Sequence, residues 1–276
     1  MVFQSDYRDV YRNLAMEEWL LDNAPELPVL VLYVNSPCVV IGKNQNPWRE
    51  CRLSLMEQEG VPLARRVSGG GAVYHDEGNL NVGVIVSRTK YAEEKQYDLI
   101  FQTLEKFGIK GSRLGKNSLA VNDLKFSGQA FCYRRDRVLH HGTLLVNADL
   151  SRLGRYLGPE VDGIETKAVA SVPAKVANLS SFAPELTVEK LSNALVATFQ
   201  ERYGSDGVTD WWSEVDVKKY AGTQFLPMIG KISSNDWKLG HTPRFTVVRN
   251  GQRLEVEKGQ VVNLDGAPLF SEWVKG

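Results

Sequence analysis

Apolar residues recur along this chain with helical and strand-like periods in alternation. The stretches "NLAMEEWLLDN" (13–23) and "YDLIFQTLEKFG" (97–108) repeat about every 3.6 residues and predict helices, and another is predicted after Thr187. In "NLNVGVIV" (79–86) the period is two, which predicts a half-buried strand. Its apolar face would hold Leu80, Val82, Val84 and Val86, and its other face Asn79, Asn81 and Gly83.

Turn and cap residues divide the chain between these segments. The stretch "PVLVLYVNSPCVVIGKNQNPWRECRLSLMEQEG" (28–60) predicts two strands and then one helix, with Asn46 as N-cap, Pro47 at its first position and Gly60 at its end. "SLAVNDLKFSGQAF" (118–131) predicts a hairpin that turns at Asn122–Asp123. Simple alternation would place Lys125, Ser127 and Gln129 on one face of that hairpin.

The pattern changes after about residue 228. "FTVVRNGQRLEVEKGQVVNLDG" (245–266) predicts two or three short strands around an Asn250–Gly251 turn. We therefore predict a catalytic domain over residues 1–227 and a small, short, β-rich accessory module over 228–276.

Composition narrows the class of protein. The 33 basic and 33 acidic residues cancel, which argues against a nucleic-acid partner, and no apolar run is long enough to cross a membrane. Cys38, Cys51 and Cys132 form neither a disulfide framework nor a zinc motif, which indicates a reducing compartment. Cys38 stands in an apolar strand and is expected in the core.

The chemistry is expected around "RRVSGGGAVYHDEGN" (65–79). Three consecutive glycines indicate positive φ or close approach of a ligand, and the preceding arginines favour a phosphate or carboxylate. A Walker A loop needs a lysine directly after its glycines, a dinucleotide fingerprint must open a helix, and no Gly-x-Ser-x-Gly elbow is present. A metal site is not expected, because His140 and His141 are adjacent in a strand and point to opposite faces.

Four motifs together resemble the lipoate–protein ligase A and lipoyltransferase family, from about residue 10 to "WKLGHTPRFTV" and a little beyond. They are "GKNQNPWREC", "ARRVSGGGAVYHDEGNLN", "KFSGQAF" and "HHGTLLVNADLSRLGRYL", and "SVPAKVANL" follows in the family's order. The stretch "NQNPWRECRLSLMEQEGVPLARR" resembles the mitochondrial lipoyltransferases of eukaryotes.

The resemblance implies an α+β fold like that of biotin and lipoate ligases, a mixed sheet with packed helices. It also implies that ATP with Mg²⁺ activates lipoate as lipoyl-AMP, and that a lysine of an acceptor domain then takes the lipoyl group. The acceptors would be the lipoyl domains of 2-oxoacid dehydrogenase E2 subunits and the glycine cleavage H protein. The protein would act as a monomer, in the mitochondrial matrix if eukaryotic and otherwise in the cytoplasm.

By the same resemblance, Lys125 contacts the lipoyl carbonyl and the α-phosphate and is the catalytic residue. Arg66 would hold phosphate, whereas Arg65 is expected to form a structural ion pair. His75 and His141 equally fit a pocket lining or a hydrogen-bonded core. The implied substrate- and nucleotide-binding residues are Arg66, Ser68, Gly69, Gly70, Gly71, Ala72, Val73, Tyr74, His75, Asn79 and His141.

One departure from the family bears on ATP. The family carries Arg-Asn-Asp before the hairpin, where this chain has Lys116, Asn117 and Ser118. The missing carboxylate and the short accessory module put activation by ATP in doubt more than lipoyl transfer.

Three alternatives stay open. An octanoyl- or lipoyl-amidotransferase would need a cysteine nucleophile, for which Cys132 would have to face the pocket. A biotin ligase would carry a Gly-Arg-Gly-Arg loop, which is absent from this sequence. A catalytically silent lipoyl-domain-binding protein would not need Lys125 and Arg66.

Overall fold

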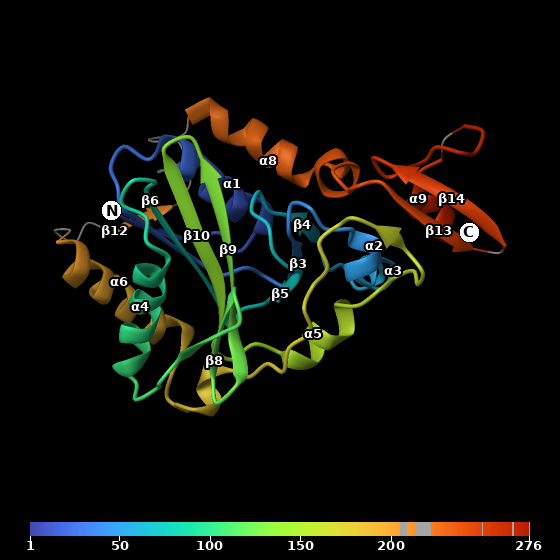
Figure 1. Cartoon of the computed structure of the whole chain (residues 1–276). Helices are drawn as coiled ribbons and strands as arrows, with labels where there is room; N and C mark the ends of the chain where they lie inside the picture. The colour runs from blue at the N-terminus through green and yellow to red at the C-terminus, as the bar shows by residue number, and fades with distance from the viewer. Residues whose placement is uncertain (205–208, 213–221, 250, 267, 276) are drawn as a thin grey trace. The chain divides into compact units, whose positions relative to one another are not determined.

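The computed structural model describes residues 1–204, 209–212, 222–249, 251–266 and 268–275, with only the backbone for 209–212, Trp273 and Lys275 (Figure 1). The chain packs as two compact units. Unit 1 comprises Met1–Ser36, His75–Leu150 and Pro173–Pro227, and unit 2 comprises Pro37–Tyr74, Ser151–Val172 and Met228–Gly276. The segment after residue 228 thus packs with two earlier segments of the chain. The functional boundary at 227/228 stays a prediction.

Unit 1 is built on a mixed sheet of eight strands. In spatial order they are β12 (Thr209–Trp212), β1 (Val2–Ser5), β2 (Val29–Tyr33), β6 (Asn79–Ser87), β10 (Arg137–Leu145), β9 (Leu124–Arg134), β8 (Ser118–Val121) and β7 (Ser112–Leu114). β1 runs parallel to β12 and β2, and the other neighbouring strands are antiparallel. The predicted mixed sheet is confirmed.

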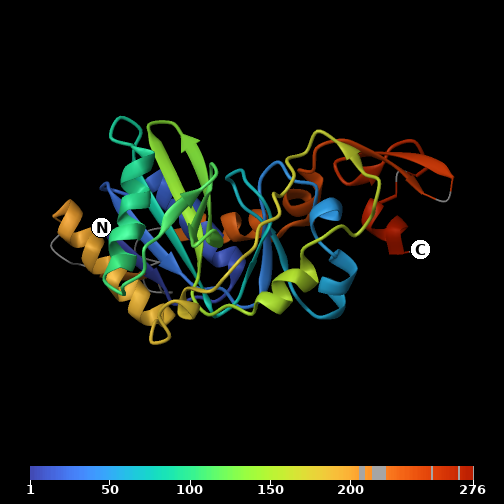
Figure 2. The same cartoon turned by 60° about the horizontal axis from the view of Figure 1, so that its bottom comes forward.

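Helices cover both faces of this sheet. α4 (Glu93–Glu105) and α6 (Val188–Tyr203) lie side by side on one face (Figure 1, Figure 2). They bury the predicted apolar face of β6. α1 (Val10–Asn23) lies on the other face, where its Glu17 bonds to His141 of β10. Glu17 also lies against Gly83 of β6, and Asn79 and Asn81 on the same face are buried, so the prediction of a half-buried β6 is wrong.

Side-chain caps begin two of the long helices, one of them after Thr187 as predicted. The Asp9 side chain accepts from the Arg12 N–H and begins α1, and Thr187 caps α6 in the same way. The predicted hairpin turns at Asn122 and Asp123, which have φ of 50° and 63°. Two consecutive residues with positive φ are what a two-residue hairpin loop requires.

Unit 2 holds two smaller sheets. One has the order β4 (Leu63–Arg65), β3 (Cys38–Ile41), β5 (Val73–His75), and in it Cys38 is fully buried, as predicted. The other has the order β11 (Glu165–Thr166), β13 (Phe245–Arg249), β14 (Gln252–Glu257), β15 (Gln260–Val261). Arg249 pairs with Gln252 across the predicted hairpin turn, although Asn250 lies outside the described residues.

Short helices complete the two units: α2 (Pro47–Glu50), α3 (Leu53–Gln58), α5 (Leu150–Tyr156), η1 (Leu179–Ser181), η3 (Gly222–Gln224), α8 (Phe225–Ser233), the π-helix η4 (Asp236–Gly240) and α9 (Phe270–Lys275). Trp48 packs its ring 5.6 Å from that of Phe245 and 5.1 Å from that of Phe270. The core of the C-terminal strands thus includes a residue from the start of unit 2. Within the described residues, no helix has the length and apolar character needed to span a bilayer.

The helix predicted over 47–59 is in fact two helices. Asn46 caps α2 through its side-chain oxygen, as predicted, and Gly60 follows α3 with φ of 66°. Between them the chain straightens, because the Arg52 N–H donates to Tyr156 O and Cys51 forms a bridge with Leu157. A contact with residues a hundred positions away overrides the local helical pattern.

Candidate functional site

The triple-glycine loop of unit 2 joins β4 to β5. Gly70 has φ of 90°, a conformation that side chains disfavour, so the predicted positive φ is confirmed at this glycine. The loop lies directly against Gly42, where a Cβ would be only 2.3 Å from Gly70 O. Gly42 was missed from sequence, although it stands in the quoted "GKNQNP" stretch.

Arg66 holds the loop in this shape. Its Nη2 donates to Gly69 O at 2.6 Å and to Gly71 O at 2.8 Å, and its Nε donates to Ser68 Oγ at 3.0 Å. Arg66 and Ser68 are both buried. The guanidinium binds loop carbonyls here, and its predicted contact with phosphate stays a prediction.

Arg65 is structural, but the predicted ion pair is wrong. The residue is 1% exposed, and its guanidinium donates to the carbonyl oxygens of four residues and to one hydroxyl. These acceptors are Gly42 O, Lys43 O, Gln45 O, Lys238 O and Thr242 Oγ1. Burial lowers the pKa of Arg65 to about 10, which leaves it protonated at neutral pH. The arginine thereby fastens the 42–45 turn to the segment 238–242.

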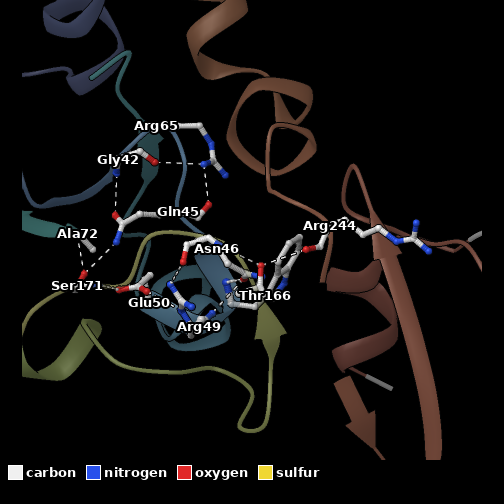
Figure 3. A network of polar contacts seen from close by, with 12 residues as sticks. Gly42, Gln45, Asn46, Arg49, Glu50, Arg65, Ala72, Thr166, Ser171 and Arg244 are labelled. Atoms are coloured by element: carbon white, nitrogen blue, oxygen red, sulfur yellow. Dashed lines mark hydrogen bonds and ion pairs between the residues drawn. The ribbon is translucent and has the colours of Figure 1, made fainter. Parts of the chain in front are cut away.

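A polar network of Ser171, Gln45 and Glu50 contacts the end of the glycine loop at Ala72 (Figure 3). Ser171 Oγ accepts from the Ala72 N–H at 2.9 Å and from Gln45 Nε2 at 3.1 Å. The Ser171 N–H donates to Glu50 Oε2 at 3.0 Å, and Gln45 Oε1 accepts from the Gly42 N–H at 2.9 Å. None of these three side chains was a predicted site residue; the only signal was their place in quoted motifs.

Beyond Ala72 the predicted residues turn towards a core. Tyr74 is 1% exposed, and its ring centroid lies 5.7 Å from that of Tyr156. Ala72 and Val73 are half-buried. The predicted contacts of Ala72, Val73 and Tyr74 with the nucleotide stay predictions.

In unit 1 the chain continues through His75 to Asn79. His75 Nδ1 is 3.0 Å from Asn35 Nδ2, so this histidine is hydrogen-bonded in a buried setting. Asp76 accepts from the Gly78 and Asp149 N–H groups and closes the turn before β6. Asn79 is fully buried, and among the described residues neither atom of its amide has a hydrogen-bond partner. Such a group needs an explanation, and an unfilled ligand contact is one.

Lys125 is fixed through its backbone. Its N–H donates to Lys175 O at 2.8 Å, and its carbonyl accepts from the Ala177 N–H at 3.0 Å. The "SVPAKVANL" motif thus pairs with the "KFSGQAF" motif. The Lys125 side chain is half-buried, and its Nζ lies 3.4 Å from the position that a Cβ on Gly128 would take.

The predicted face shared by Lys125, Ser127 and Gln129 is wrong. Ser127 and Gln129 do share one face, where Gln129 Nε2 donates to Ser127 Oγ. Phe126 is an extra residue between the pairs Ala120–Lys125 and Leu119–Ser127, which is a β-bulge. The bulge reverses the alternation and puts Lys125 beside Gly128 on the opposite face.

This correction brings the predicted residues of unit 1 together. His141 pairs with Gly83 and Ala130, and Leu145 pairs with Asn79, so His141 and Asn79 lie on the same face of the sheet as Gly128 and Lys125. His141 Nδ1 lies 2.9 Å from Glu17 Oε2, and both side chains are buried. Gly83 leaves room for Glu17, since a Cβ at this position would lie 3.2 Å from the Glu17 carboxylate. Glu17 was missed, because helical periodicity says nothing of a partner in a distant strand.

His140 points to the other face, as predicted. Its Nε2 lies 2.9 Å from Gln129 Oε1, and its ring centroid is 5.1 Å from that of Tyr97 in α4. Burial, aided by His141 and then Arg113, lowers its pKa to about 3. His140 is therefore neutral and structural.

Cys132 does not lie near Lys125. They are seven positions apart along β9, which at about 3.3 Å per residue is roughly 20 Å. A thioester relay through Cys132 would therefore act far from the lysine.

Asp123, the candidate replacement for the family's missing carboxylate, does not adjoin Ser118 in the strand. Asp123 belongs to the turn, whereas Ser118 is at the far end of β8, roughly 10 Å away along the strand. Within the described ranges, no three His, Cys, Asp or Glu side chains are grouped so that they could hold a metal ion.

Comparison with known proteins decides the family. A model described as "Lipoyl protein ligase A/B catalytic domain" matches residues 9–200. The chain belongs to the lipoate–protein ligase family. The predicted family, enzyme class and activity, attachment of lipoyl groups to acceptor proteins, are confirmed at this level.

Two curated relatives are bacterial proteins named lipoate-protein ligase A. That of Psychrobacter cryohalolentis is 39% identical over 252 residues, which cover 89% of this chain and 74% of the relative. That of Bdellovibrio bacteriovorus is 39% identical over 254 residues, which cover 89% and 73%. These relatives do not support the predicted likeness to mitochondrial lipoyltransferases or a mitochondrial location.

A solved structure agrees with the fold. The crystal structure of P. falciparum LipL1 in complex with lipoate has a TM-score of 0.77 and 31% identity, and the match covers 95% of this chain and 82% of that one. The predicted α+β fold of the lipoate ligases is thereby confirmed.

Proposed function

We propose that this enzyme transfers a lipoyl group from lipoyl-AMP to one lysine of an apo lipoyl domain. The acceptors would be E2 subunits of 2-oxoacid dehydrogenases and the H protein of glycine cleavage. We propose that it works as a monomer in the cytoplasm, a location that the bacterial relatives favour.

The observation that carries this proposal is the fixed Lys125. Its backbone is hydrogen-bonded on both sides to residues 175–177, and the bulge at Phe126 turns its side chain to the face that also holds Asn79 and His141. A charge held on a rigid strand needs little reorganisation when negative charge develops on a substrate oxygen.

The chemistry asks the protein for position and charge only. The acceptor amine attacks the carbonyl carbon of lipoyl-AMP, the C–O bond to phosphate breaks, AMP leaves, and the amine loses a proton. In this scheme Lys125 stabilises the carbonyl and phosphate oxygens, and the glycine loop supports the ligand by its backbone. The proposed binding residues are otherwise those predicted, with Arg66 shaping the loop carbonyls as well.

Lipoate, ATP and Mg²⁺ would supply lipoyl-AMP. Magnesium prefers carboxylate oxygens and is usually coordinated by one or two protein carboxylates together with substrate phosphates. Ser118 offers only a hydroxyl, and Asp123 lies in the turn beyond the other end of β8, which is itself roughly 10 Å from Ser118. We therefore expect activation by ATP to be slower than transfer from preformed lipoyl-AMP.

The test follows an apo lipoyl domain by mass spectrometry, with either lipoyl-AMP or lipoate plus Mg–ATP as donor. Lys125→Ala should lower transfer from both donors by about a hundred- to a thousand-fold. The control Lys110→Ala, at an exposed lysine of the same unit, should have no effect. Near-normal transfer by a folded Lys125→Ala protein would contradict the mechanism.

Ser118→Asp tests the ATP half separately. It should narrow the gap between the two donors by accelerating only the reaction with Mg–ATP. Equal rates from both donors in the unmodified enzyme would show that Ser118 does not limit activation.

A further inference from the structure

Ser171 has a hydrogen-bonding arrangement that none of the predicted roles uses. Its Oγ accepts two bonds, from the Ala72 N–H at 2.9 Å and from Gln45 Nε2 at 3.1 Å. A serine hydroxyl has two lone pairs and one proton. With both lone pairs engaged, the only remaining capacity of Ser171 is to donate its proton.

That proton has no acceptor among the described residues. The side chain is half-buried, beside the end of the glycine loop (Figure 3). Two fixed N–H donors hold the oxygen, so the O–H bond must point away from both. The Ser171 hydroxyl is thus a donor of fixed orientation beside Gly71 and Ala72.

The position of Ser171 is set by residues around it rather than by its own rotamer alone. Its N–H donates to Glu50 Oε2, and Glu50 Oε1 accepts from Arg49 Nε at 2.9 Å. Arg49 Nη2 in turn donates to Ala168 O at 3.0 Å, three residues before Ser171. The segment 168–171 is thus held at both ends, which a precise contact requires.

The N-terminal end of the segment 168–171 is hydrogen-bonded, through Thr166, to the residue before β13. The Ala168 N–H donates to Thr166 Oγ1 at 3.1 Å, and Thr166 Oγ1 donates to Arg244 O at 3.2 Å (Figure 3). The position of Ser171 therefore depends on β11 and β13 as well as on α2.

The glycine loop is shaped to receive this hydroxyl. A Cβ on Gly71 would lie 3.1 Å from Ser171 Oγ and 3.4 Å from its Cα. The third glycine thus leaves room for Ser171 to reach the Ala72 N–H. The close approach of Ser171 therefore explains why a glycine stands at position 71, where φ is not positive.

We propose that Ser171 is a substrate-contacting residue that donates its hydroxyl proton to an oxyanion of an acyl-adenylate lying against the glycine loop. The inference rests on the proposed function for the identity of the ligand. Because its lone pairs are filled, Ser171 recognises only acceptor atoms, and the carbonyl and phosphate oxygens of an acyl-adenylate are such atoms.

Two measurements test this on the full chain. The first is hydrogen exchange of the Ala72 amide without ligand, and the second is the Kd for lipoyl-AMP by calorimetry. Ser171→Ala should remove the protection of Ala72 and raise the Kd roughly ten-fold or more, since a donor and an acceptor are both lost. Ser171→Thr keeps the hydroxyl and should retain both properties.

Ser233→Ala is the matched control, because this hydroxyl also forms a hydrogen bond within unit 2, to Gly230 O, but lies outside the network around Ser171. Unchanged Ala72 exchange in Ser171→Ala would overturn the proposal, as would lost protection with an unchanged Kd. If Ser171→Ala does not fold, Ser171→Cys provides the test, because sulfur keeps the size but hydrogen-bonds weakly.

A failure of the proposed function would look different. The unmodified enzyme would then bind no lipoyl-AMP, while Ala72 would still be protected by Ser171. A loss of kcat with an unchanged Kd in Ser171→Ala would also contradict a ground-state contact.

Discussion

Acid should destabilise this protein through His140. The residue is 3% exposed, and burial lowers its pKa from 6.5 to about 3. Gln129 Nε2 donates to Ser127 Oγ at 2.6 Å, so Gln129 Oε1 must be the acceptor of the His140 Nε2–H. Tyr91 OH lies 3.4 Å from Nδ1 and can donate to it. A proton on Nδ1 would make the Tyr91 hydroxyl oxygen the acceptor of that contact and would place a positive charge in a buried site that already feels the charge of Arg113.

The sign of the effect follows from where protons bind. Between about pH 6.5 and 3 the unfolded chain protonates this histidine and the folded chain does not. Stability is therefore full above the unfolded pKa and falls as the pH drops through that window. One pKa unit corresponds to about 1.4 kcal/mol, so the whole gap is worth about 5 kcal/mol.

The assay is urea unfolding of the wild type and His140→Gln at several pH values between about 7 and 4. Glutamine can still donate to Gln129 Oε1 but does not titrate. The wild type should lose up to about 1.4 kcal/mol more per pH unit than the variant. His241→Gln, at an exposed histidine, controls for the loss of an imidazole. Equal pH slopes for wild type and His140→Gln would refute the reasoning.

Two further predictions concern the glycine loop and its anchor. Gly42→Ala should weaken lipoyl-AMP binding at least ten-fold in calorimetry, because its Cβ would lie 2.3 Å from Gly70 O, whereas Gly69→Ala should be tolerated, because its Cβ would meet nothing within 4 Å. Equal effects of the two variants would show that packing against Gly42 does not shape the site. Arg65→Lys should lower the free energy of urea unfolding by about 3 kcal/mol, since an ammonium cannot reach the five acceptors that the guanidinium serves; a loss below about 1 kcal/mol would mean that the freed carbonyls find other donors.

Elements with local causes could be predicted from the sequence. α1, α6 and the two hairpins need only a repeating apolar face, a cap or a two-residue turn, and each formed as expected. The errors share a physical origin in partners far along the chain. Leu157 interrupts the helix at Cys51, and Glu17 of α1 packs on the polar face of β6 at Gly83. No periodicity within 47–60 or 79–87 reports these partners.

The candidate site divides in the same way. The motifs located the glycine loop and Lys125, but one extra residue, Phe126, changed the face on which Lys125 lies. A bulge has no reliable sequence signal, because it depends on which residue of β8 pairs with which residue of β9. Ser171, Gln45 and Glu50 were missed for a different reason. Ser171 bonds to a backbone N–H 99 positions away, Glu50 to one 121 positions away, and Gln45 to the Ser171 hydroxyl 126 positions away, and such contacts leave no spacing pattern.

Arg66 shows how the structure changes the meaning of a correctly chosen residue. An anion bound to a loop needs N–H groups facing it and carbonyl oxygens facing away. Arg66 collects the Gly69 and Gly71 carbonyls on one guanidinium, which removes two partial negative charges from any ligand surface of the loop. The arginine therefore favours an anion even without touching one, by deciding which way the glycine peptides point. Glycine makes this arrangement possible because it adopts φ of 90° at Gly70 without a steric cost, and the same peptide orientation leaves the Ala72 N–H for Ser171.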